Sequence, residues 1–269
     1  MEALAGLRVV DAAAVLAAPG AARYLADFGA DVIKVEPPTG DGVRRMGWMP
    51  PDGSDSYIWK LLGRNKRSVV IDLKTDEGRD AFLRLTDSAD VVVENARPGT
   101  FERLGLGPEI LCGRNPRLVM LRVTGFGQDG PYAGRPGFAT MAEGMSGFAA
   151  INGDPDGPPL LPPVALTDEV TALAGAFAVM VALRHRDRTG EGQVVDCNLL
   201  DSVSQILSAL PSAAAHLGYE QPRLGSGIPY TVPRGTYRCS DGRWVAISTS
   251  AESVARSEEH TSELQSRGL

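Results

Sequence analysis

Leu7-Arg8-Val9-Val10-Asp11 and Asp31-Val32-Ile33-Lys34-Val35-Glu36 are the two stretches that decide the fold. Both are short runs rich in β-branched residues, which is typical of buried strands. Residues 17–28 between them are predicted to form a helix, with Pro19 near its start and Gly29 at its end. A strand, a helix and a strand in so short a span predict a βαβ unit, whose two strands run parallel.

The same alternation continues along the chain. Further strands are predicted at residues 68–73, 90–94 and 118–123, and further helices at residues 75–88, 138–149, 170–184 and 196–217. The helix at 170–184 is almost wholly apolar or small, so we expect it to be buried. The pattern predicts a doubly wound, Rossmann-like α/β domain with a parallel sheet. Ligands in such domains bind beyond the carboxyl ends of the strands, which would bring together residues 11–16, 36–45, 95–98 and 124–128.

A second, smaller domain is predicted to begin near the end of the chain. Residues 235–238 and 244–248 read as strands on either side of Ser240-Asp241-Gly242, a hairpin signal. We assign residues 1–217 to the large domain and 218–255 to the start of the small one. Residues 256–269 are abruptly polar and match the translation of a common sequencing adapter, so we interpret them as a non-native tail. On this interpretation the chain is truncated at its C-terminus.

Composition excludes several classes of function. The 269 residues are 43% hydrophobic and 22% charged, with a net charge of −6, which disfavours nucleic acid and membrane surfaces as partners. The apolar runs look too short or too interrupted to span a bilayer, and the N-terminus does not resemble a signal peptide. Three cysteines without a CxxC pair and three scattered histidines indicate a cytoplasmic protein with reduced thiols and no metal site.

The βαβ unit lacks the nucleotide-binding fingerprint. Glu36 ends the second strand, where a nicotinamide-binding protein has its ribose ligand, but residues 12–20 contain no G-x-G-x-x-G. Backbone approach to a pyrophosphate is therefore not provided for, and neither a Walker A motif nor a G-x-S-x-G elbow occurs. Dinucleotide binding is not expected.

Asp168 is the strongest candidate for a catalytic residue. It follows the rigid segment Pro162-Pro163 and stands where the long apolar helix begins. At a helix N-terminus a carboxylate is expected to stay ionised, and an ionised, fixed carboxylate can act as a covalent nucleophile. The alternative from position alone is an N-cap, the commonest role of Asp at a helix start.

Five separated blocks resemble the class III CoA-transferases, the CaiB/BaiF family. They are residues 4–11 with 25–36, Asn65-Lys66-Arg67-Ser68, Glu94-Asn95 with 97–99 and 103–105, residues 125–132, and Asp168 with the run 186–196. The resemblance extends over about residues 3–255. It implies an acyl-CoA:carboxylate CoA-transferase that takes coenzyme A as substrate, with no tightly bound cofactor, and that forms an interlocked homodimer.

The resemblance also implies roles for particular residues. The family's catalytic aspartate falls on Asp168, and its CoA-contacting positions fall on Val15, Leu16, Ala17, Asn95, Ala96, Arg103 and Thr124. Thr124 stands where relatives carry a lysine. We add Arg44, Lys66 and Arg67 as candidates for the CoA phosphates, because an acidic protein needs local cations to hold a polyanion; the alternative is solvated loop charges. Substrate choice is expected to depend on Phe126, Phe138, Met141 and Met145, unless these are core residues.

Two other functions remain open. Racemases of the family carry a histidine beside the position of Gly137, whereas this chain has Phe138 there. A two-base proton exchange would therefore lack one base, which favours the transferase over a 2-methylacyl-CoA racemase. The third possibility is a non-catalytic CoA-binding subunit, against which Asp168 argues.

Overall fold

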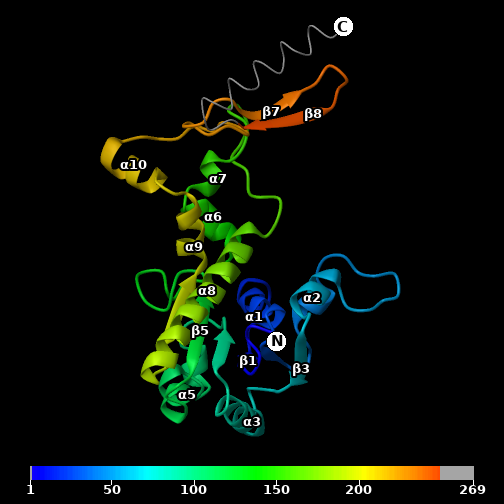
Figure 1. Cartoon of the computed structure of the whole chain (residues 1–269), viewed down its shortest axis with the longest axis vertical. Helices are drawn as coiled ribbons and strands as arrows, with labels where there is room; N and C mark the ends of the chain where they lie inside the picture. Colours follow the sequence, from blue (N-terminus) through cyan, green and yellow to red (C-terminus); the bar gives the residue numbers. More distant parts are fainter. Residues whose placement is uncertain (1, 249–269) are drawn as a thin grey trace. The chain divides into compact units, whose positions relative to one another are not determined.

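Strands between residues 8 and 198 form a six-stranded parallel sheet in the computed structural model, which describes residues 2–248 (Figure 1). The strands lie in the order β3-β2-β1-β4-β5-β6, and every neighbouring pair is parallel. Their bounds are Arg8–Asp11 (β1), Asp31–Glu36 (β2), Lys66–Val70 (β3), Val91–Glu94 (β4), Val119–Thr124 (β5) and Val194–Asn198 (β6). This is the doubly wound α/β order that the sequence predicts, and it reverses direction between β1 and β4.

The last strand of the sheet was not predicted. Residues 196–217, expected as one helix, instead contain the end of β6 followed by α9 (Leu199–Ile206) and α10 (Leu210–Leu217). β6 is an edge strand that pairs only with β5 and is half exposed. It therefore carries polar residues among its valines and lacks the continuous apolar run of the inner strands.

Helices α3 (Asp76–Thr86), α4 (Thr100–Arg103) and α5 (Pro108–Arg114) share a buried core with one face of the sheet. Phe82 of α3 and Phe101 of α4 meet edge to face, with 6.1 Å between ring centroids. The core that they enter consists of Val10, Val35, Ala89, Val92, Leu106, Leu111, Leu118 and Met120. Thr75 begins α3 as its N-cap, accepting a bond from the Gly78 N–H.

Helices α1 (Ala17–Asp27) and α8 (Leu166–Thr189) pack closely against each other. Two glycines permit the close packing of these helices and of α8 against the sheet. A Cβ on Gly20 would lie 2.8 Å from the Ala172 Cβ, and one on Gly175 would lie 3.1 Å from a methyl group of Leu121 in β5. A larger residue at position 20 would force α1 and α8 apart, and one at position 175 would push α8 away from β5.

The expectation that residues 170–184 form a buried helix is only half right. One side of α8 is buried, whereas Leu173, Phe177 and Val181 on the other side are 50%, 72% and 53% exposed. A continuously apolar sequence cannot distinguish a helix covered on all sides from one covered on a single side. Within residues 2–248, α8 is also the one helix long and apolar enough to cross a membrane, contrary to the expectation that no run would be.

The exposed side of α8 borders an apolar groove of about 370 Å³. We define this apolar groove by Ala3, Leu4, Tyr24, Leu25, Phe28, Leu173, Ala176, Phe177 and Met180. Its lining is almost entirely carbon, and Phe28 is itself 60% exposed. An exposed apolar surface of this kind is typical of an interaction site.

The remaining elements are short. A 3₁₀ helix (Gly42–Arg45) and α2 (Tyr57–Leu62) follow β2, and the single helix predicted at 138–149 is divided into α6 (Ala139–Met145) and α7 (Phe148–Ile151). The break falls at Gly147, whose φ of +90° places it in the left-handed region.

By their contacts the described residues divide into two compact units, residues 2–146 with 163–208 and residues 147–162 with 209–248. In the second unit, β7 (Arg234–Arg238) and β8 (Trp244–Ser248) form the predicted antiparallel hairpin. Arg223 donates hydrogen bonds to the carbonyls of Asp154 and Ala150 in the same unit. The predicted division at residues 217/218 stays a prediction, and the predicted tail 256–269 lies outside the described residues.

Candidate active site

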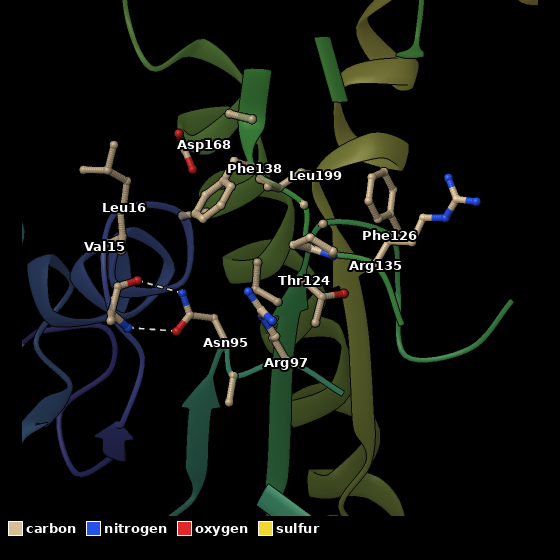
Figure 2. Close-up of a pocket in the computed structure, with 18 of the residues that line it drawn as sticks. Val15, Leu16, Asn95, Arg97, Thr124, Phe126, Arg135, Phe138, Asp168 and Leu199 are labelled. Atoms are coloured by element: carbon tan, nitrogen blue, oxygen red, sulfur yellow. Dashed lines mark hydrogen bonds between the residues drawn. The ribbon is translucent and has the colours of Figure 1, made fainter. Parts of the chain in front are cut away.

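A cavity of about 420 Å³ opens beyond the carboxyl ends of the strands where the sheet order reverses (Figure 2). Its walls come from the loops after β1, β4 and β5, from residues 133–140 and from the first residues of α8 and α9. The predicted site residues that line it are Val15, Leu16, Ala17, Asn95, Ala96, Thr124 and Asp168. Segments far apart in sequence are thus brought together at one site.

Asn95 fixes the loop that follows β1. Its Oδ1 accepts a hydrogen bond from the Ala14 N–H at 2.8 Å, and its Nδ2 donates to the Ala14 carbonyl at 2.7 Å, the two bonds drawn in Figure 2. The next residue, Val15, has a φ of +68°, a strained value for a β-branched residue, and is 44% exposed. The two hydrogen bonds of Asn95 therefore fix a strained stretch of backbone at the cavity wall.

A network of buried charged residues also bonds to the loop that follows β1. Asp11 accepts a bond from the Ala13 N–H, and the Lys34 ammonium donates to the Ala13 carbonyl. Lys34 also lies 3.2 Å from a carboxylate oxygen of Asp41. Asp11 and Lys34 are both at most 2% exposed. Removing either one would therefore leave the other as a buried charge without its partner.

Asp168 reaches the cavity from the first turn of α8, in which it is the third residue. Ala165 is the N-cap residue and no side chain caps the helix, so the N-cap alternative for Asp168 is wrong. The part of the chain that the structure describes provides no hydrogen bond to its carboxylate. The group is therefore free to face a ligand, beside Phe138 in Figure 2.

The protonation behaviour of Asp168 differs from the sequence expectation. Burial, followed by the negative charges of Glu143 and Glu169, raises the pKa of Asp168 from 3.8 to about 6. The helix-dipole argument predicted the opposite direction, because it considered neither burial nor these two carboxylates. At pH 7 the group is still mostly ionised and can act as a nucleophile, and it is more basic than an ordinary aspartate.

Glu143 of α6, the acidic neighbour with the larger effect on Asp168, is buried, with 4% of its surface exposed. It accepts a hydrogen bond from the Thr167 hydroxyl at 2.8 Å. Thr167 directly precedes Asp168, and its carbonyl accepts a bond from the Thr171 hydroxyl at 2.7 Å. Glu143 is thereby attached to the helical turn that carries the candidate nucleophile.

Glu169 lies in a different environment from Glu143. The Arg23 guanidinium donates to its carboxylate at 2.6 Å, and the Tyr24 hydroxyl donates to the same oxygen. These bonds outweigh the effect of partial burial and hold the pKa of Glu169 below its ordinary value. Its charge is compensated on the α1 side of α8.

Arg44 does not line the cavity. Its guanidinium contacts both carboxylate oxygens of Glu36 and one of Asp55, and it stacks on Trp59 at 3.9 Å from the ring centroid. Although burial opposes ionisation of Glu36, bonds from Arg44 and Ser68 lower its pKa to about 2. The charge of Arg44 is thus already matched within the chain.

Lys66 is likewise remote from the cavity. It lies in β3, and its ammonium donates to Asp11 at 2.8 Å and to the Pro19 carbonyl at 2.7 Å, with 2% of the side chain exposed. Burial lowers the pKa of Lys66, and the neighbouring Asp11 opposes that effect. In this position its ammonium bonds to the strand and helix that flank the loop after β1.

The remaining two predicted cations also lie outside the cavity lining. Arg67 is exposed and binds Asp31 through two bonds of 2.7 Å. Arg103 is exposed in α4 and donates to the Thr100 hydroxyl at 2.9 Å. The structure does not bring Arg44, Lys66, Arg67 and Arg103 together, and their CoA contacts stay predictions.

Two arginines that the sequence analysis did not select do line the cavity. Arg97 comes from the loop after β4 and Arg135 from the loop after β5, and neither forms an ion pair within residues 2–248. Arg135 stacks on Tyr132 at 4.4 Å from the ring centroid, and Figure 2 shows its guanidinium directed away from Asp168. The rule that ligands lie beyond the strand ends would have identified Arg97, since residues 95–98 were assigned to the crevice.

The four apolar residues expected at the substrate pocket divide into two groups. Phe126 and Phe138 line the cavity, whereas Met141 and Met145 are exposed residues of α6 outside its lining. Gly125 and Gly137 bring the two ends of the loop between β5 and α6 into contact, since a Cβ on Gly125 would lie 2.6 Å from the Gly137 Cα. No group of three His, Cys, Asp or Glu residues suited to a metal occurs among the described residues.

Relatives of known family resemble most of the chain. The model of CoA-transferase family III matches residues 4–259. The succinyl-CoA–L-malate CoA-transferase beta subunit of Chloroflexus aurantiacus is 46% identical over 254 residues, covering 93% of this chain and 62% of that protein. The succinate–glutarate CoA-transferase of Agrobacterium fabrum is 42% identical, covering 89% of this chain and 61% of its own length. The chain therefore spans less than two thirds of these relatives.

A solved structure supports the same assignment. A CaiB/BaiF family protein from Brucella suis superposes with a TM-score of 0.84 at 39% identity, covering 90% of this chain and 65% of that one. The six-stranded doubly wound sheet and the match of the family model over nearly the whole described chain agree. The chain belongs to CoA-transferase family III, the family that its sequence motifs predict.

Proposed function

We propose that this protein transfers coenzyme A from an acyl-CoA donor to a carboxylic acid, with Asp168 as the covalent nucleophile. The observation that carries the proposal is the unpartnered carboxylate of Asp168 at the wall of the switch-point cavity. Among the described lining residues there is no Cys, Ser, His or Lys that would serve as an alternative nucleophile or base. Family membership supports the reaction class, and the Asp168 carboxylate is a group that can act as the nucleophile of such a reaction.

The proposed reaction conserves the thioester bond energy in two symmetrical halves. An Asp168 oxygen attacks the thioester carbon, CoA leaves as thiolate, and a mixed anhydride forms. The thiolate then attacks the carboxyl carbon of Asp168, which releases the donor acid and leaves an aspartyl-CoA thioester. The acceptor carboxylate attacks that thioester, the CoA thiolate leaves again, and a second anhydride forms. The thiolate then attacks the acceptor acyl carbon, which gives the new acyl-CoA and releases the Asp168 carboxylate. No net proton is required in any step, so one carboxylate suffices.

The surroundings of Asp168 suit covalent intermediates. Anhydrides and thioesters hydrolyse if water reaches them, and the apolar faces of Phe126, Phe138 and Leu199 border the cavity. We propose that the loop of Val15, Leu16 and Ala17 binds the CoA chain. Arg97 and Arg135 are suited to its phosphates, because they are the cations of the described cavity lining and lack carboxylate partners.

Racemisation is the weaker alternative. It requires one base on each face of the substrate α-carbon, and within residues 2–248 Asp168 is the cavity's one ionisable group that can accept a proton. Phe138 occupies the position at which the second base was sought. The cavity therefore favours transfer between carboxylates.

Relatives suggest the substrates and the assembly. Those described above are named for succinyl-CoA, malate, succinate and glutarate, so we propose small dicarboxylic acids as donor and acceptor. We also propose a cytoplasmic homodimer in which a second copy covers the apolar groove, whose exposed Phe28 and Phe177 would otherwise face water.

Isotope exchange tests the transfer reaction. Labelled succinate is mixed with succinyl-CoA, with malate and glutarate as further acceptors, and label entering the CoA ester is measured. We expect exchange in the wild type, none in Asp168→Asn, and full exchange in Asp187→Asn, which alters a carboxylate of the same helix outside the cavity. Exchange that survives Asp168→Asn would contradict the proposal. Solvent deuterium at the α-carbon of a 2-methylacyl-CoA, without acid exchange, would establish racemisation instead.

A further inference from the structure

Glu143 is a buried acid for which the proposed reaction has no use. It is 4% exposed, and the part of the chain that the structure describes contains no ion pair to its carboxylate. The carboxylate accepts a hydrogen bond from the neutral hydroxyl of Thr167, at 2.8 Å. Buried carboxylates are normally paired with a cation or with several donors, so an uncompensated one at this position requires a reason.

The position of Glu143 connects it to the nucleophile. Thr167 is the second residue of α8 and Asp168 is the third, so a bond to Thr167 fixes the turn from which Asp168 projects. The bond from Thr171 to the Thr167 carbonyl ties that turn to the next one. In addition, the charge of Glu143 acts on Asp168 directly.

We propose that Glu143 is a positioning residue that acts on the reaction through Asp168, by fixing the first turn of α8 and by placing a second negative charge beside the nucleophile. The inference rests on the proposed function of Asp168. Two adjacent carboxylates repel each other while both are ionised. When Asp168 is acylated it becomes neutral, and the repulsion disappears. Glu143 therefore destabilises the free carboxylate relative to the covalent intermediates and makes that carboxylate a stronger nucleophile.

Other charged groups near Asp168 do not have this property. Glu169 of α8 is compensated by Arg23 and Tyr24 from α1. On α9, which packs against both α6 and α8, Asp201 is bonded to Asn198. The cavity cations Arg97 and Arg135 would reduce the repulsion, but they belong to the loops after β4 and β5 and are not among the groups that shift Asp168.

Glu143→Gln tests the proposal, because the amide retains an acceptor for Thr167 and removes the charge. The Asp168 carboxyl is followed by ¹³C NMR in aspartate-labelled protein, and Asp168→Asn assigns its signal. We expect the pKa of Asp168 to fall by about one unit, together with the acidic limb of kcat/KM. We expect kcat to fall by about three- to tenfold with little change in KM, since a less basic carboxylate is a weaker nucleophile. Glu169→Gln, the matched control, should shift the pKa of Asp168 by less.

An unchanged titration of Asp168 in Glu143→Gln would overturn the proposal. The NMR measurement needs no turnover. If the protein had no transfer activity, the proposed function would be contradicted, but the effect of Glu143 on Asp168 could still be measured. Should the variant not fold, labelled wild type provides the second test. The Asp168 signal should show a second inflection caused by a neighbouring carboxyl group, and a curve with a single inflection would refute the coupling.

Discussion

Replacing Asp168 with asparagine is expected to stabilise the fold while it abolishes the proposed chemistry. The pKa of Asp168 lies at about 6 in the folded protein and at 3.8 without it, because of burial and the charges of Glu143 and Glu169. Between these two values the unfolded chain releases its proton first, so rising pH favours unfolding. The loss of stability caused by ionised Asp168 in the folded protein is absent below about pH 3.8 and complete above about pH 6. Two pKa units correspond to about 3 kcal/mol, and we expect about 1–3 kcal/mol after partial exposure is considered.

Urea unfolding at two pH values measures this effect. Trp48 and Trp59 lie in the α/β unit and Trp244 in the hairpin, so a Trp244→Phe background restricts fluorescence to the α/β unit. We expect Asp168→Asn to raise the unfolding free energy at pH 7.5 by about 1–3 kcal/mol, and by under about 1 kcal/mol near pH 4. Glu169→Gln should have the opposite sign at pH 7.5, since it loses the bonds from Arg23 and Tyr24. An asparagine variant that is less stable than wild type at pH 7.5, or equally shifted at both pH values, would refute the argument.

Three further substitutions test the cavity and its support. Asn95→Ala removes both bonds to Ala14. We expect steady-state kinetics to show a rise of about tenfold in the KM for acyl-CoA, and urea titration to show a fall of about 1–2 kcal/mol in the unfolding free energy. An unchanged KM would show that the loop after β1 does not contribute to acyl-CoA binding. Arg97→Ala should raise the KM for acyl-CoA and weaken its salt dependence. Arg114→Ala, matched in charge but outside the cavity and paired with Asp87, should have neither effect, and equal effects of the two variants would refute the assignment of the phosphate site. Lys66→Met leaves a buried carboxylate with one fewer cation, and we expect a loss of about 3–5 kcal/mol in urea unfolding; a loss under about 1 kcal/mol would show that the network is dispensable.

The central part of the fold follows from local sequence. β1, α1 and β2 were predicted because apolar β-branched runs, Pro19 and Gly29 are local signals, and the doubly wound order follows from their repetition. β6 was missed because an exposed edge strand needs no apolar run, so Val194–Asn198 lacks that signal. The exposure of Phe177 was missed because a helix sequence does not specify how many of its sides are covered.

Site residues were predicted correctly where their position at a strand end determines that they line the cavity. The prediction was less successful for residues whose environment depends on partners distant in sequence. Val15, Asn95, Thr124 and Asp168 meet at one cavity because each follows a strand or begins a helix at the same edge of the sheet. The bond from Lys66 to Asp11 was not predicted, because Asp11 is 55 positions away in sequence. The direction of the Asp168 pKa was wrong for the same reason. A helix dipole is visible in local sequence, whereas burial and a carboxylate from another helix are not.

Intact-mass spectrometry after mixing with succinyl-CoA tests the nucleophilic role of Asp168 most directly. The proposed reaction requires a covalent species that carries CoA on the protein as a thioester, that is discharged by an added acceptor acid, and that is released by hydroxylamine. We expect this adduct in the wild type, its localisation to the peptide containing Asp168, and its absence in Asp168→Asn. An adduct that persists in the asparagine variant, or acceptor-dependent transfer without any adduct, would contradict covalent catalysis by Asp168.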